Sequence, residues 1–362
     1  MKITEIRSTI VALQRRKALK TFYGESPDTI TVVVQVHTDE GISGVGQTVA
    51  ASPWGSETPE AIKVCIDKYL RPVLVGEDPF DIERLYLLAQ RGLRGANYAF
   101  TAIDYALWDI KGKALNVPVY QLLGGRCTAG APLHAFVERE NVKETAARIE
   151  ELADQGWCWF KIKIGFGMEE DLSWYSALRK AVGDRARFQL DGNTGYSLGE
   201  AIQTLSQMEK LGGLALVEQP VRHLDEMTVL VNRLVTPVQA DEALTGPRSV
   251  YEIATARAAH VLHFKIHKYG GLLQAKRMAA IAEAAGMGIS VAPYFDIIAA
   301  AAAHFAASTP IARWPAGASD MEDTLLTEPL SPTGQVMEPP ERPGLGVELD
   351  EKKLAAYGKR WE

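Results

Sequence analysis

The sequence of 362 residues contains no long run of basic residues, and its formal net charge is −6. Nucleic acids and anionic membrane surfaces are held by clustered Lys and Arg, so this composition argues against both as partners. No uninterrupted apolar stretch reaches the length of a membrane span, and residues 1–7 lack the apolar core of a secretory signal. We therefore expect a cytoplasmic protein that binds neither nucleic acid nor membrane.

Cysteine is also scarce. It occurs only at Cys65, Cys127 and Cys158, an odd number without the close spacing of a metal site. A disulfide framework is not expected in a reducing cytosol. We interpret all three residues as buried, reduced thiols.

Charged side chains follow short apolar runs at regular intervals through the middle of the chain. Such runs are typical of buried parallel strands, and helix-compatible segments lie between them. The interval of about 25 residues is that of one strand-plus-helix unit in an eight-fold barrel. Because the carboxyl ends of barrel strands meet at one mouth, we expect the charged residues to form a ring there. They are Lys161, Lys163, Asp191, Glu218, Asp241 and Lys265.

The regions before and after this alternation are organised differently. Strands come first and helices follow, an α+β arrangement that cannot be part of a barrel. Thr58 is expected to cap a helix whose buried face includes Val64 and Tyr69. We predict a capping domain over residues 1–127, a barrel over residues 128–322, and a segment over residues 323–362 that returns to the capping domain.

Two polar-aromatic segments of the first domain are expected to be loops between strands. Residues 16–28 include Phe22 and Tyr23, and residues 49–58 include Trp54. Loops of this length are either mobile surface or lids over a site. The sequence leaves both interpretations open.

Three carboxylates, those of Asp191, Glu218 and Asp241, end successive predicted strands. An acid at such a place is most often the N-cap of the next helix, but three of them at the spacing of the barrel unit indicate a shared role. Converging carboxylates repel one another unless a cation lies among them, and oxygen ligands alone favour a hard ion, Mg²⁺ first and Mn²⁺ second. Asn193 and Glu242 lie beside these ligands, and we expect them to support the metal site.

The lysines suggest proton transfer. Lys161 and Lys163 alternate on one strand and so face the same side, while Lys265 comes from the sixth strand, nearly across the ring. The alternative is a set of structural ion pairs with the acids. A basic lysine needs a pKa lowered from about 10.4 to about 7.5, which requires about 4 kcal/mol, and a like charge about 4 Å away can supply it. This set suits removal of a proton α to a carboxylate, with stabilisation of the enediolate.

These residues resemble the enolase superfamily, and within it the muconate-lactonizing-enzyme subgroup. The resemblance extends over essentially the whole chain. Its markers are Lys161-Ile162-Lys163, Asp191-Gly192-Asn193, Glu218-Gln219-Pro220, Asp241-Glu242, and Lys265 followed by Gly270-Gly271. The related mandelate racemase subgroup would need an Asp-His pair on the sixth and seventh strands, and this chain has neither residue there.

The resemblance implies an α/β fold, a modified TIM barrel (β/α)7β with an N-terminal α+β capping domain, assembled as a homo-oligomer. It implies Mg²⁺ on the three carboxylates, Lys163 and Lys265 as the acid/base pair, and Lys161 as electrostatic support. Cycloisomerases and dipeptide epimerases of this kind often carry a Glu where this chain has Tyr294. Dipeptide epimerases carry an acidic pair whose first position aligns with Met321, which argues against a dipeptide substrate.

A substrate pocket follows from the lid segments and from the ends of the last strands. Its candidate residues are Phe22, Tyr23, Trp54, His134, Tyr294, Phe295 and Met321. The run from Asp296 to Ala300 is similar to that of hydroxyproline-betaine epimerases. Trp54, Tyr294 and Phe295, together with Trp314, could form an aromatic box for a cation, although core or lid packing explains them equally well. His134 and His263 are interpreted as interior residues with satisfied hydrogen bonds.

We therefore predict a Mg²⁺-dependent isomerase that acts on a small carboxylate. The first hypothesis is a racemase or epimerase of an amino-acid derivative, either an N-acyl amino acid or a proline- or betaine-like compound. The alternative is a muconate cycloisomerase or a hydroxy-acid dehydratase, in which one lysine handles the carbon proton. A barrel that has lost its chemistry would show a broken ring, and all six charged positions are present.

Overall fold

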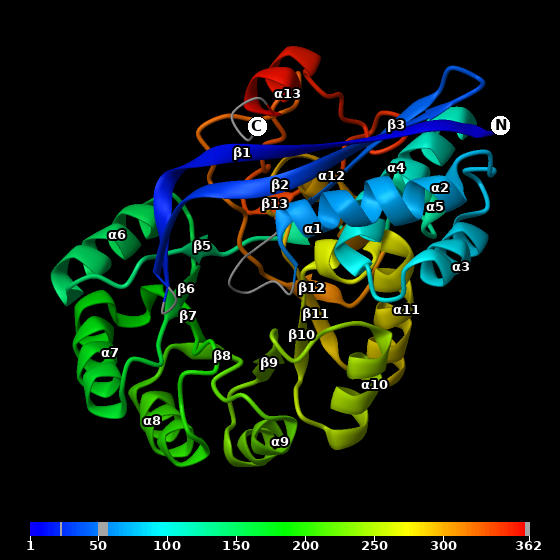
Figure 1. The fold of residues 1–362 in the computed structure, drawn as a ribbon. Helices are drawn as coiled ribbons and strands as arrows, with labels where there is room; N and C mark the ends of the chain where they lie inside the picture. The colour runs from blue at the N-terminus through cyan, green and yellow to red at the C-terminus, as the bar shows by residue number, and fades with distance from the viewer. Residues whose placement is uncertain (22–23, 50–56, 359–362) are drawn as a thin grey trace.

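An eight-stranded parallel sheet, curled into a barrel, dominates the computed structural model, which describes residues 1–21, 24–49 and 57–358 (Figure 1). Its strands are hydrogen-bonded in sequence order from β5 to β12, and a parallel bridge between Leu133 and Ala316 joins the two edges. The predicted barrel is therefore confirmed. The strands are β5 (Ala135–Phe136), β6 (Trp159–Lys163), β7 (Arg187–Asp191), β8 (Leu214–Glu218), β9 (Val238–Ala240), β10 (Val261–Phe264), β11 (Gly288–Val291) and β12 (Ala312–Trp314).

Helices connect the barrel strands and lie outside them (Figure 1). Local sequence explains where several begin: Asn141 caps α6, and Ser197 with Glu200 forms a capping box on α8. The helices are α6 (Val142–Asp154), α7 (Met168–Val182), α8 (Leu198–Leu211), α9 (Leu224–Arg233), α10 (Pro247–Ala256), α11 (Gly271–Ala284) and α12 (Asp296–Ala307), with the 3-10 turns η2 (Gly183–Arg185) and η3 (Ile266–Lys268).

The capping region is an antiparallel sheet in the order β1-β2-β3, covered on one face by helices. Alternate residues of β2 face opposite sides: Val32 and Val34 pack in a core with those helices, whereas Val33 packs with the barrel core. The elements are β1 (Ile3–Thr21), β2 (Gly24–Thr38), β3 (Ser43–Val49), α1 (Pro59–Val64), the π-helical η1 (Cys65–Leu70), α2 (Arg71–Leu74), α3 (Ile82–Gly92), α4 (Asn97–Leu115) and α5 (Val119–Leu122).

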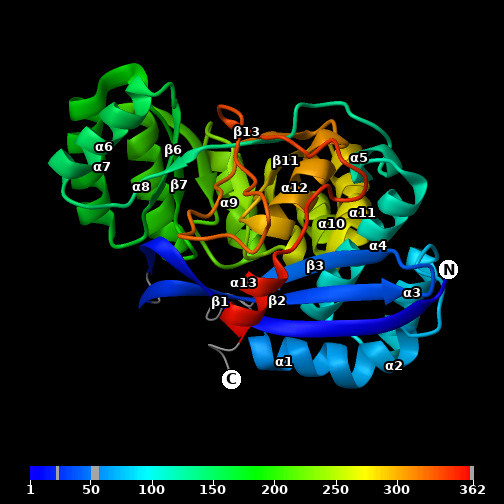
Figure 2. The same cartoon turned by 90° about the horizontal axis from the view of Figure 1, so that it is seen from above.

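Buried acids of α4 fasten this region to the rest of the chain. Asp104 accepts a hydrogen bond from the Leu272 amide at the start of α11 (2.6 Å), and Asp109 accepts one from the Leu345 amide in the C-terminal segment (2.8 Å). That segment also pairs β13 (Val336–Met337) with β4 (Ala131–Pro132), and its helix α13 (Glu351–Gly358) lies over β1 (Figure 2). The three domain borders predicted from sequence remain predictions.

Several expectations for the first domain were wrong. Residues 16–21 and 24–28 belong to β1 and β2, which pair as far as Thr21 and Gly24, so this segment is a long hairpin rather than a loop. Thr58 does cap α1, but the buried residues of the following helical stretch are Ile62, Ile66, Leu70 and Leu74, while Val64 and Tyr69 are about half exposed. The branched aliphatic residues, each four positions apart, define the apolar face.

The three cysteines are free, as expected, but none is fully buried: Cys65 is partly buried, and Cys127 and Cys158 are exposed. No helix in the described parts of the chain is long and apolar enough to cross a membrane.

Candidate active site

The three predicted carboxylates lie at one rim of the barrel. Asp191 and Glu218 are the last residues of β7 and β8, where they are register partners, and Asp241 directly follows β9. All three side chains are buried, at most 1% exposed. Parallel neighbouring strands that end together therefore bring the acids together, as the spacing predicts.

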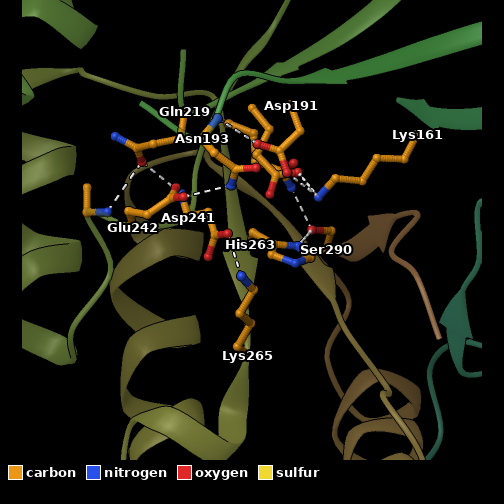
Figure 3. Close-up of polar contacts among 12 residues, drawn as sticks. Lys161, Asp191, Asn193, Gln219, Asp241, Glu242, His263, Lys265 and Ser290 are labelled. Atoms are coloured by element: carbon orange, nitrogen blue, oxygen red, sulfur yellow. Dashed lines mark hydrogen bonds and ion pairs between the residues drawn. The ribbon is translucent and has the colours of Figure 1, made fainter. Parts of the chain in front are cut away.

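The three lysines reach into the same rim and are paired with these acids; Figure 3 shows Lys161 and Lys265. Lys161 contacts Asp191 at 2.9 Å and Glu218 at 2.7 Å. Lys163 contacts the same Asp191 oxygen at 2.6 Å, and Lys265, which follows β10, contacts Asp241 at 2.5 Å. Lys163 and Lys265 keep about a fifth of their side-chain area exposed. The structure thus brings together all six charged residues of the predicted ring.

Asn193 and Glu242 connect the ring at its upper edge. The backbone N–H of Asn193 donates a hydrogen bond to Asp191 (3.0 Å). The Asn193 side chain donates a hydrogen bond to Glu242 (2.8 Å) and accepts one from Lys163. Gln219, which the sequence showed only as part of a motif, accepts from the Asp241 amide (3.0 Å) and so orients that residue. Asn193 and Glu242 thus lie beside the carboxylates, and their support of a metal site stays a prediction.

Charge compensation sets the protonation of two of the carboxylates. Burial alone would raise the pKa of Asp191, but Lys161 and Lys163 outweigh burial and hold it below its ordinary value. Lys265 does the same for Asp241. Both acids are therefore ionised at neutral pH.

Glu218 differs from its two neighbours. Burial and the charge of Asp191 raise its pKa to about 8, despite the contact with Lys161. Burial would lower the pKa values of Lys161 and Lys265, yet the acids outweigh it, and both values lie above the ordinary one. Without a cation these two lysines are therefore charged, whereas a lysine that acts as a base must be neutral.

Unpaired oxygens show that the acids fit a cation. Glu218 Oε1, Asp241 Oδ1 and Glu242 Oε2 are buried and have no hydrogen-bond partner within the described residues. Atoms of Glu218, Asp241 and His263 lie within 4.8 Å of one another, a grouping that can hold a metal ion. Asp191, which was predicted as a ligand, is not part of this group; its oxygens contact the two lysines and the backbone N–H of Asn193. A hard divalent cation suits a set of this kind, dominated by oxygen.

A chain of interior hydrogen bonds lies behind the carboxylates and was not predicted. Gln189 donates to Glu218 (2.6 Å) and to Gln239 (2.9 Å), Gln239 donates to Ser290 (2.6 Å), and the Ser290 hydroxyl lies 2.8 Å from His263 Nδ1. Figure 3 shows Ser290 and His263 beneath the acids. The two-residue period of the strands could have indicated it, because Gln189, Gln239 and His263 each stand two positions before a ring residue.

The predicted pocket residues differ in their partners and in their burial. His263 has a partner, but both ring nitrogens of buried His134 lack one among the described residues, and burial together with Lys161 lowers the pKa of His134 to about 3. Tyr294 has a left-handed backbone (φ 51°), its ring centroid lies 4.5 Å from that of His267, and Phe295 is buried. Phe22, Tyr23 and Trp54 lie outside the described residues.

The aromatic box that included Trp314 is wrong. The Trp314 ring lies against Gly288, at the start of β11, and forms an edge-to-face pair with Trp159 at the start of β6 (centroids 6.1 Å apart). Strand starts form the end of the barrel opposite the carboxylate rim. Trp314 is therefore a packing residue far from the site.

Comparison with known proteins gives two family matches. The N-terminal domain of mandelate racemase / muconate lactonizing enzyme matches residues 4–124, and the enolase C-terminal domain-like family matches residues 144–353. Muconate cycloisomerase 1-1 of Acinetobacter lwoffii is 32% identical, with 94% of this chain and 91% of that protein covered. N-succinyl-L-Arg/Lys racemase of Bacillus cereus is also 32% identical (98% and 97% covered), and the crystal structure of the Bacillus cereus racemase superposes with a TM-score of 0.92 at 29% identity (99% and 98% covered).

Proposed function

Because the chain belongs to the mandelate racemase/muconate lactonizing enzyme family of the enolase superfamily, whose curated relatives are isomerases, we propose that it is a Mg²⁺-dependent isomerase that removes the proton α to a substrate carboxylate. We propose further that it racemises or epimerises an N-acylated or proline-like amino-acid derivative. One observation carries this proposal. Lys163 on β6 and Lys265 after β10 are four strands apart in the eight-stranded barrel, so they face each other across its mouth.

In this proposal Asp191, Glu218 and Asp241 hold the cation, with Mn²⁺ as a substitute. The cation supplies Lewis acidity toward the substrate carboxylate. A cation held by these acids would reduce their effect on Lys161 and Lys265, whose raised pKa values depend on those acids. Lys161 then offers its charge to the carboxylate as the enediolate develops.

Lys163 and Lys265 exchange the proton. One lysine takes it from one face of the α carbon, and the other returns a proton to the opposite face, which inverts the centre. Asn193 contacts Lys163 and links it to Glu242, so it holds that amine in place. The two lysines need no rearrangement of the backbone to act from opposite sides.

A cycloisomerase remains the second candidate, because a muconate cycloisomerase is as similar to this chain as the racemase is. In that reaction only one of the two lysines would handle the carbon proton. The position of both lysines at the rim favours the racemase.

Deuterium exchange distinguishes a racemase from a cycloisomerase. N-acyl amino acids of both configurations and cis,cis-muconate are incubated in deuterated water with Mg²⁺, and products are followed by NMR and optical rotation. We expect deuterium at the α carbon with inversion, and we expect Lys163→Ala and Lys265→Ala each to abolish racemisation without loss of the folded state. A ring-closed product, or full racemisation after either substitution, would refute the assignment.

A further inference from the structure

Arg15 is a half-buried cation that the proposed chemistry does not use. It follows Val11 and Leu13 along the face of β1 that packs on the barrel core. Here β1 loses its register with β2: pairing stops at Gln14 and resumes at Leu19, opposite a segment that contains Pro27. Bulges of this kind commonly redirect a side chain near a site.

The strand pairs instead with the segment that follows the last barrel strand. Arg15 is bridged to Met321, and the flanking bonds run from Arg16 N to Asp320 O and from Glu322 N to Gln14 O. This makes Arg15 and Met321 a non-hydrogen-bonded antiparallel pair, whose side chains stand close together on one face. Arg15 therefore lies at the rim, next to a residue predicted to line the pocket.

Among the described residues, no acid compensates the Arg15 charge. Arg15 forms no ion pair with a described side chain, and its buried Nε has no hydrogen-bond partner there. Asp320 pairs with the exposed Arg16, and Lys17 pairs with both Glu138 and Glu140. Burial lowers the pKa of Arg15, as expected for a guanidinium that lacks a counterion.

Tyr294 connects this cation to the catalytic ring. Its phenol lies within electrostatic reach of Lys265, Asp241 and Lys161 and also of Arg15. No described group makes a hydrogen bond to its hydroxyl. A ligand that reaches from the lysines past Tyr294 would thus meet a guanidinium with free donors.

We propose that Arg15, assisted by the Tyr294 hydroxyl, binds a second, distal carboxylate of the substrate, so that the enzyme selects dicarboxylates over compounds with a neutral or cationic far end. A guanidinium offers a paired set of donors that matches a carboxylate. The proposal rests on the proposed function, because it assumes that the first carboxylate lies at Lys161 and the cation. It makes Arg15 a specificity residue supplied by the capping region.

The test compares N-succinyl-L-leucine with N-succinamoyl-L-leucine, in which a neutral amide of similar shape replaces the distal carboxylate. Exchange of the α proton is measured for wild type, Arg15→Met and the control Arg16→Met, all with Mg²⁺. We expect wild type and Arg16→Met to prefer the succinyl compound by about 30-fold in kcat/KM, the usual scale for a charged hydrogen bond. In Arg15→Met the preference should fall to about 1.

The outcomes separate the two proposals. Exchange of both compounds with equal efficiency, or a preference that survives Arg15→Met, overturns the distal subsite and leaves the proposed function intact. If neither compound exchanges, calorimetric titration with the succinyl compound decides. Binding weakened about 30-fold by Arg15→Met alone supports the subsite and rejects the isomerase reaction on this substrate, whereas equal binding rejects the subsite.

Discussion

The raised pKa of Glu218 leads to a prediction about how the stability of the protein depends on pH when no cation is bound. An acid has an ordinary pKa of 4.5 in the unfolded chain, and here the folded value is about 8. Between these values the folded state holds one proton more than the unfolded state, so its contribution to stability is present at low pH and is lost as the pH rises toward 8. From pH 6 to pH 8 this loss amounts to about 2 kcal/mol.

The perturbation is Glu218→Gln, which keeps the shape and removes the titration. The difference in stability between the variant and wild type should shift in favour of the variant by about 2 kcal/mol between pH 6 and pH 8, or about 3 °C in Tm for a chain of this length. Buried histidines such as His134 titrate equally in both proteins and cancel in the difference. The assay is thermal unfolding in EDTA at pH 6, 7 and 8.

A second readout checks the same carboxylate. Below pH 8 a cation that binds Glu218 must displace its proton, so Mg²⁺ binding at pH 6 should release about one proton, measured by calorimetry in two buffers of different ionisation enthalpy. A Tm difference that stays constant from pH 6 to pH 8, together with no proton release, would refute the reasoning.

Two further predictions concern the surroundings of the site. The Asp171 carboxylate accepts hydrogen bonds from Arg139, from Tyr196 and from the backbone amides of Gly165 (2.9 Å) and Phe166 (3.1 Å). Because these amides follow shortly after Lys163, Asp171→Ala should lower the free energy of unfolding by about 3–5 kcal/mol and also lower kcat. Glu170→Ala is the control, since this exposed neighbour pairs with the same arginine and should cost under about 1 kcal/mol; equal losses of Tm would contradict the assignment. Trp314→Leu should lower stability by about 1–3 kcal/mol and leave KM unchanged, and a tenfold rise in KM would return Trp314 to the pocket.

The ring of charges could be predicted because its members lie at or within two residues of the ends of buried strands, and the carboxyl ends of all barrel strands lie at one rim. The sequence could not show how the acids share their partners. Asp191 serves two lysines while Glu218 keeps an unpaired oxygen, an asymmetry that depends on side-chain distances. Trp314 was misplaced because the orientation of the last strand is set by its closure against residues 131–134 rather than by its own pattern.

The first domain was harder to predict for a related reason. The segment from Arg16 to Asp28 is polar and aromatic, which is typical of a loop, yet its backbone continues two long strands. Arg15 was overlooked because an arginine beside Arg16 and Lys17 appears to be part of a solvated surface, and only the partners of each side chain distinguish them.

The strand β1 carries its inward-facing side chains to the barrel rim and is itself covered by α13 from the far end of the chain. The proposed acid–base groups and the proposed selectivity group are thereby encoded far apart, the former between residues 161 and 265 and the latter within the first 15. Mutational libraries confined to the inward positions of β1 and to Met321 would thus explore new substrates while the proton-transfer apparatus is left untouched. Such a separation offers protein engineers one site for altering preference and another for preserving the reaction.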